Sequence, residues 1–111
     1  MNIFDMFSQD ACSLGGKDSI QWTWREYYEN RSKLESEGRK VVLVNMIEHP
    51  VAGSTPISNE LFQEDHPDGT YFVLYCHSGG TSGYMQKKLS SMYPNFNFVN
   101  MSGGIGMYEE E

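Results

Sequence analysis

The segment 71-YFVLYCHSGGTSG-83 decides the fold predicted for this chain. Its first five residues, Tyr71–Tyr75, are apolar or aromatic, favour β-structure and carry no charge, which indicates a short buried strand. Two adjacent glycines follow, and then Met85, Leu89 and Met92 recur at helical spacing. The sequence therefore predicts a strand–loop–helix unit in which Cys76 lies on the loop before the helix N-terminus.

The position of Cys76 has chemical consequences. The first turn of a helix carries backbone N–H groups without intrahelical partners, and these groups favour negative charge in front of them. Glycines allow successive N–H groups to converge on an anion. A cysteine there is stabilised as the nucleophilic thiolate, and the helix terminus alone lowers its pKa by roughly 0.2–1.5 units. The alternative is that Cys76 is a small apolar core residue; the glycine-rich turn and the helix after it favour the reactive thiol.

The other apolar runs predict the rest of an α/β domain. Val41–Met46 is a continuous, largely β-branched run, typical of a strand buried on both faces of a parallel sheet. Further strands are expected at Ser19–Trp22 and Phe96–Asn100. Helices are expected from a Thr23 N-cap to residues 34–36, at Ser58–Glu64 and over 84–93, with a last helical turn in 105–111. The predicted fold is a small, mostly parallel central sheet flanked by helices, with residues 45–56 forming a loop on the same sheet edge as Cys76.

The size and cysteine content suit one small domain. A chain of 111 residues can build one modest core. We interpret residues 1–17 as an N-terminal extension and residues 18–111 as the domain. Cys12 lies in the extension and is either an incidental thiol or a resolving cysteine that pairs with Cys76. The two cysteines are too few for a disulfide framework.

Charge and composition narrow the classes of partner. The net charge of -7 disfavours nucleic acid and anionic membranes, which bind clustered lysine and arginine. No basic, apolar secretory signal opens the sequence and no apolar run reaches transmembrane length, so a cytoplasmic location is expected. The histidines lack metal-ligand spacing, and no metal site is expected at His49, His66 and His77.

The loop that follows the central strand resembles the active-site loop of rhodanese-like sulfurtransferases, C-x-x-G-x-R-S. Cys76, Gly79 and Ser82 match this pattern, and Thr81 stands where the family has arginine. Val41–Asn45 is similar to the family's earlier buried strand, without the charged residues of its Asp-x-Arg end.

Two further segments, one on each side of the cysteine loop, extend the resemblance. Gly53 and Pro56 match the family's G-H-I-P-G pattern. Val99–Tyr108 is similar to its closing V-x-x-L-x-G-G-I-x-x-W, with Tyr108 in place of tryptophan. These segments and the cysteine loop run from about residue 20 to the end of the chain, and the chain resembles a single-domain rhodanese-like protein.

The resemblance implies a sulfurtransferase that carries a sulfane sulfur as a persulfide on Cys76. The sulfur would come from a thiosulfate-like small donor or a persulfidated protein and pass to a thiol or cyanide-like acceptor, with no metal or organic cofactor. The bound anion would be stabilised by the loop residues His77, Ser78, Gly79, Gly80, Thr81 and Ser82, as in an oxyanion hole. The residues expected at the pocket rim, beyond the carboxyl end of a neighbouring strand, are Asn45, Glu48 and His49. Because Thr81 brings no positive charge, weak thiosulfate activity is expected.

Other functions are compatible with a cysteine on such a loop. A cysteine-based phosphatase is disfavoured, because its C-x5-R loop needs arginine where this chain has Ser82. Two alternatives remain open: a thiol redox or sulfide sensor in which Cys76 is oxidised reversibly, and a non-catalytic interaction domain that keeps the fold. His77 is expected at the surface or loop rim rather than as the base, since activating bases usually come from elsewhere in the chain.

Overall fold

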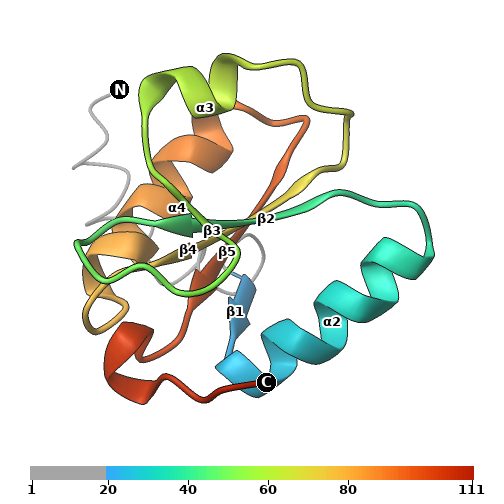
Figure 1. Cartoon of the computed structure of the whole chain (residues 1–111). Coiled ribbons are helices and arrows are strands. Elements are labelled where there is room, and N and C mark those ends of the chain that lie inside the picture. The colour runs from blue at the N-terminus through green and yellow to red at the C-terminus, as the bar shows by residue number, and fades with distance from the viewer. Residues whose placement is uncertain (1–19) are drawn as a thin grey trace.

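The described part of the chain, residues 20–111 of a computed structural model, has the predicted α/β fold (Figure 1). A parallel sheet carries helices on both faces, an arrangement consistent with a small rhodanese-like domain. The expected extension 1–17, Cys12 and the first residue of the expected edge strand, Ser19, lie outside the described residues.

The sheet contains five strands in the order β1-β5-β4-β2-β3, and every neighbouring pair is parallel. The strands are β1 (Ile20–Trp22), β2 (Val41–Asn45), β3 (Ser54–Pro56), β4 (Tyr71–Tyr75) and β5 (Asn97–Met101). The strand that leads into Cys76, β4, is the central one and pairs with β2 and β5. A central parallel strand is covered on both faces, which explains why its sequence is a continuous run of apolar and aromatic residues.

Each predicted helix is present, and the helix that follows Cys76 starts earlier than its sequence signals predict. The elements are α2 (Trp24–Ser36), α3 (Asn59–Gln63), α4 (Gly80–Met92) and a short 3-10 helix, η1 (Gly104–Met107). The predicted capping box closes the start of α2: the Glu26 N–H donates to Thr23 Oγ1 at 3.2 Å, and the Thr23 N–H donates to Glu26 Oε1 at 2.9 Å. No helix within residues 20–111 is long and apolar enough to cross a membrane.

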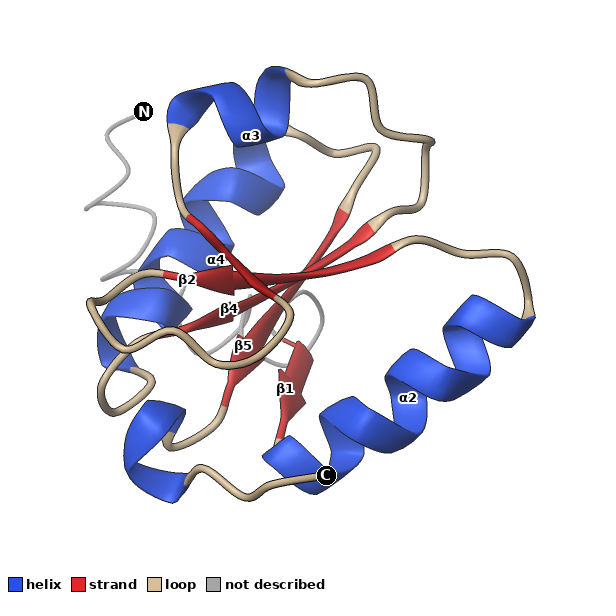
Figure 2. Ribbon diagram, in the orientation of Figure 1, coloured by secondary structure: helices blue, strands red, loops and turns tan. Residues whose placement is uncertain are grey.

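Alternate residues of β4 face two separate cores. Val73 and Tyr75 pack beneath α2 in a cluster with the aromatic side chains of that helix, Trp24 and Tyr27. Phe72 and Leu74 face the opposite side, where α3 and α4 cover the sheet (Figure 2). The period-two alternation of the strand therefore assigns each helix to a face, and both faces of the strand next to Cys76 are buried.

One strand was absent from the sequence prediction. Residues 54–56, expected inside a loop, form β3, which pairs with β2 along Leu43–Asn45. This segment is short and polar, so no apolar pattern marks it. It occupies the edge of the sheet, where a strand pairs on one side only and proline is tolerated at its end.

The start of α4 also differs from the prediction. The helix begins at Gly80 rather than near Tyr84, so Gly80, Thr81 and Ser82 belong to its first turn and not to the preceding loop. The missed turn contains only small residues, which carry no helical apolar period. Gly79 precedes it with a φ of 98°, a left-handed conformation that glycine adopts without strain.

Candidate active site around Cys76

Three hydrogen-bond partners converge on the sulfur of Cys76. The Gly79 N–H donates to Sγ at 3.2 Å and the Ser82 N–H donates to it at 3.3 Å. The Ser82 hydroxyl lies 3.2 Å from Sγ, where either group can be the donor. Two of these partners belong to the first turn of α4, so the sulfur occupies the anion-favouring position at the helix N-terminus that the sequence predicted.

These contacts change the acidity of the thiol. Burial raises the pKa of Cys76, but the contacts of the Ser82 hydroxyl and of the Ser82 and Gly79 N–H groups, with a smaller effect of the Ser78 N–H, outweigh it, and the net pKa lies below its ordinary value. The lower pKa increases the fraction of thiolate near neutral pH. Cys76 is only 4% exposed, so little of its surface is open to a reactant.

The segment after β5 supports the cysteine loop through backbone hydrogen bonds. The Ile105 N–H donates to the carbonyl of Cys76 at 2.8 Å, and the Gly106 N–H donates to the carbonyl of His77 at 3.1 Å. Gly104 has a φ of 57°, and a Cβ there would overlap the Cys76 carbonyl oxygen. Its carbonyl accepts from the indole N–H of Trp24 at 2.9 Å, which ties this turn to α2. The glycine pair that resembled the family's closing motif therefore packs directly against the cysteine loop.

The loop residues predicted for anion binding surround Cys76, with different exposures. Ser82 is fully buried and Gly79 is half-buried. The remaining four are exposed at the mouth of the loop, where they face solvent: His77, Ser78, Gly80 and Thr81. Ser82 and Gly79 contact the sulfur, and the four exposed residues form the solvent-facing surface of the loop.

The three residues expected at the rim lie on the same sheet edge but differ in role. Asn45 is 6% exposed, and its Oδ1 accepts from the Ile47 N–H at 2.8 Å, so its side chain holds its own loop. Glu48 is exposed. His49 is also exposed, and its ring lies 5.8 Å from that of His77, edge to face. The two histidines thus bring the loop after β2 against the loop of Cys76, and His77 lies at the surface as expected.

Two residues that the sequence analysis did not single out organise the site. Tyr75 donates its hydroxyl to the carbonyl of His49 at 2.8 Å and accepts from the Val51 N–H at 3.0 Å, which fixes the loop after β2. Asn100, in β5, is 5% exposed and contacts both Ser82 and Gly79. A polar residue between the apolar Val99 and Met101 was the available signal for Asn100.

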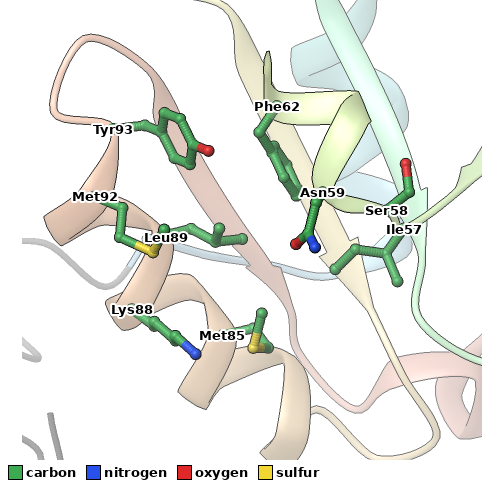
Figure 3. Close-up of a pocket in the computed structure, with 9 residues that line it drawn as sticks. All are labelled: Ile57, Ser58, Asn59, Phe62, Met85, Lys88, Leu89, Met92 and Tyr93. Atoms are coloured by element: carbon green, nitrogen blue, oxygen red, sulfur yellow. The ribbon is translucent and has the colours of Figure 1, made fainter. Parts of the chain in front are cut away.

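A cavity of about 380 Å³ lies away from Cys76, between α3 and α4. Figure 3 shows the side chains of both helices facing each other across it. Its walls are mainly apolar, with Phe62 on one side and Leu89 and the exposed Met92 on the other. None of the residues that contact Cys76 Sγ lines this cavity, so it is separate from the candidate active site.

Metal chemistry has no donor set in the described region. Within residues 20–111, no group of three or more histidine, cysteine, aspartate or glutamate side chains is arranged to hold a metal ion. Cys76 is a free, buried cysteine.

Comparison with known proteins supports the fold. No protein-family model matches the sequence, and no curated protein matches it significantly. A crystal structure of a protein from Lactobacillus plantarum is similar over 92% of this chain and 90% of that chain, with a TM-score of 0.52 and 12% sequence identity. A likeness at this identity concerns the α/β fold alone, so function is argued from the site.

Proposed function

We propose that this protein is a sulfurtransferase that carries a sulfane sulfur as a persulfide on Cys76. The observation that carries the proposal is the convergence of the Ser82 hydroxyl and the N–H groups of Gly79 and Ser82 on one sulfur atom. The two N–H donors favour the thiolate, which is the nucleophile in sulfur transfer. The resemblance of the loop to the rhodanese pattern supports the same assignment.

The reaction requires no change in overall oxidation state. The Cys76 thiolate attacks the outer sulfur of a donor persulfide, R–S–SH; a new S–S bond forms, the donor S–S bond breaks, and R–S⁻ leaves. The product is Cys76–S–SH. An acceptor thiolate or cyanide then attacks the outer sulfur and releases Cys76, which needs neither a metal nor an organic cofactor.

Burial of Cys76 favours donors with an unsubstituted terminal sulfur. A residue that is 4% exposed is accessible to a single protruding atom more readily than to a substituted disulfide. The burial of Cys76 also disfavours a thiol redox sensor, whose reactive cysteine is usually solvent-accessible. A non-catalytic interaction domain would have no need of two N–H donors and a hydroxyl converging on one buried thiol. Persulfide donors of low molecular weight or on proteins are therefore the preferred substrates, and a reducing cytoplasm, where they coexist with free thiols, is the proposed compartment.

The test is transfer of sulfur to cyanide. The protein is loaded with a glutathione persulfide donor, freed of donor, and treated with cyanide, and the thiocyanate formed is measured beside Cys76→Ser. We expect thiocyanate from the wild type only. If both proteins give the same background while Cys76 is alkylated rapidly, sulfur transfer is excluded and the redox sensor is favoured.

Thr81 provides a prediction about donor choice. It is exposed in the first turn of α4 and carries no charge, so it attracts no dianion. We expect Thr81→Arg to increase the rate of loading from thiosulfate by about tenfold or more, since charge-assisted bonds contribute roughly 1.5–3 kcal/mol. Loading from a persulfide donor should change little.

Thr81→Gln is the matched control, because it adds length and hydrogen-bonding groups without charge. It should leave the thiosulfate rate close to that of the wild type. Equal rates for Thr81→Arg and the wild type would show that the missing charge does not limit thiosulfate use.

A further inference from the structure

The amide of Asn100 has a fixed orientation behind the site. Its Nδ2 donates to the Gly79 carbonyl at 3.0 Å and to Gln21 Oε1 at 2.8 Å. A carbonyl oxygen can only accept, so the nitrogen must face Gly79 and the oxygen must face the other side. On that side, Asn100 Oδ1 is in close hydrogen-bond contact with Ser82 Oγ.

The Ser82 hydroxyl has one proton and two acceptors that compete for it. It lies in contact with Asn100 Oδ1 and 3.2 Å from Cys76 Sγ. When Cys76 is a neutral thiol, its S–H can donate to Ser82 Oγ while the Ser82 O–H donates to Asn100 Oδ1, and every group is satisfied. When Cys76 is a thiolate, both Sγ and Oδ1 need the same proton.

We infer that Asn100 is a positioning residue that withholds the Ser82 proton from the Cys76 thiolate. Asn100 favours the two states in which Sγ carries no charge, the resting thiol and the loaded persulfide, whose charge lies on the outer sulfur. It disfavours the empty thiolate between them. The effect of Asn100 is therefore to limit the thiolate population and to keep the thiolate that does form more nucleophilic, since nucleophilicity rises with pKa.

The cysteine loop does not depend on Asn100 for its position. The Gly79 carbonyl also accepts from the Gly83 N–H at 3.0 Å, and this bond belongs to the start of α4. A Cβ at Gly83 would lie 3.3 Å from Asn100 Nδ2, so the Asn100 amide packs directly against the backbone of Gly83. Asn100→Leu can therefore remove the competing acceptor while the loop remains held by its own helix.

The test is the pH dependence of iodoacetamide alkylation of Cys76 in a Cys12→Ser background. We expect Asn100→Leu to lower the pKa of Cys76, which increases the thiolate fraction below that pKa by about threefold to tenfold. The plateau rate at high pH should fall, because the more stabilised thiolate is less nucleophilic. Gln21→Leu is the matched control: it removes the other Nδ2 partner without touching Ser82, and it should leave both quantities unchanged.

A second variant and a double variant keep the inference falsifiable. Asn100→Asp has nearly the same shape and a stronger acceptor, so it should raise the pKa of Cys76, whereas a purely structural disturbance would move both variants in one direction. In a Ser82→Ala background, Asn100→Leu should change the thiolate fraction by less than about twofold, since the contested proton is absent. An equal shift with and without Ser82, or a rise in pKa in Asn100→Leu, would overturn the inference.

The inference rests on the proposed function only in taking Cys76 as a thiolate nucleophile, and alkylation does not require sulfur transfer. A protein that shows these pKa shifts but yields no thiocyanate contradicts the proposed function and leaves the role of Asn100 intact. A protein that transfers sulfur but shows none of the shifts contradicts the role of Asn100 alone.

Discussion

Gly104→Ala is expected to unfold or deform the cysteine loop and to destabilise the protein by about 2 kcal/mol or more. A positive φ at a non-glycine residue costs roughly 1–2 kcal/mol. At this position the new Cβ would also overlap the Cys76 carbonyl oxygen and crowd the backbone of His77, neither of which can move without shifting the loop. The measurements are urea unfolding and the rate of Cys76 alkylation at neutral pH, in a Cys12→Ser background.

Gly38→Ala separates the cost of a positive φ at alanine from the cost of steric overlap with the cysteine loop. Gly38 has a φ of 83°, and a Cβ there would meet nothing within 4 Å. It should show the conformational cost alone, with no change in the reactivity of Cys76. If both alanine variants lose the same stability and keep the wild-type alkylation rate, the close packing of Gly104 on the cysteine loop has no functional importance.

Ser82→Ala is expected to raise the pKa of Cys76 by about one unit. The variant removes the hydroxyl that lies 3.2 Å from Sγ, and a hydrogen bond to a charged group contributes roughly 1.5–3 kcal/mol. The net stabilisation of the thiolate in the wild type is smaller than this, because the Ser82 hydroxyl must give up its hydrogen bond to Asn100 before it can donate to the thiolate. One pKa unit corresponds to about tenfold less thiolate at a pH below the pKa.

The readout is the rate of alkylation as a function of pH. Alkylation of the wild type should rise with pH and level off above a pKa that lies below the ordinary value for cysteine. The curve for Ser82→Ala should be displaced toward higher pH. Ser78→Ala is the matched control, because Ser78 acts on Cys76 through its backbone N–H and the variant keeps that group. Equal curves for the two variants would show that the Ser82 hydroxyl does not stabilise the thiolate.

The sequence was sufficient for the central part of the fold because strong local patterns coincide there. The uncharged run Tyr71–Tyr75, the apolar run after Arg39 and Lys40, and the Thr23 capping box each act over a few residues and are all found in the structure. Cys76 was placed on the correct loop because a strand end and a glycine pair are local signals too.

The features that escaped prediction depend on contacts between distant segments. The strand β3 exists because it pairs with β2, and its own residues are too polar and too few to indicate a strand. The contact between Asn100 and Ser82 joins residues 18 positions apart, and the support from Gly104 comes from beyond the end of β5. Such contacts follow from the order of strands in the sheet, which short-range patterns do not determine.

The exposed end of the site was predicted in position but not in detail. His49 and His77 approach each other because Tyr75 fixes the loop after β2, and the tyrosine acts from the core rather than from the loop. Asn45 was expected at the rim from its place at a strand end, yet its side chain turns back to the Ile47 N–H. The end of a predicted strand indicates where a residue lies in the fold. It does not indicate which group the side chain of that residue contacts.

Persulfide formation on Cys76 can be measured as the intact mass of the protein after incubation with a persulfide donor and removal of that donor. We expect that the wild type gains the mass of one sulfur atom, that dithiothreitol removes it, and that Cys76→Ser gains none. A wild type that keeps its original mass under conditions in which Cys76 is alkylated rapidly, or an equal gain in Cys76→Ser, would contradict the assignment of Cys76 as the sulfur carrier.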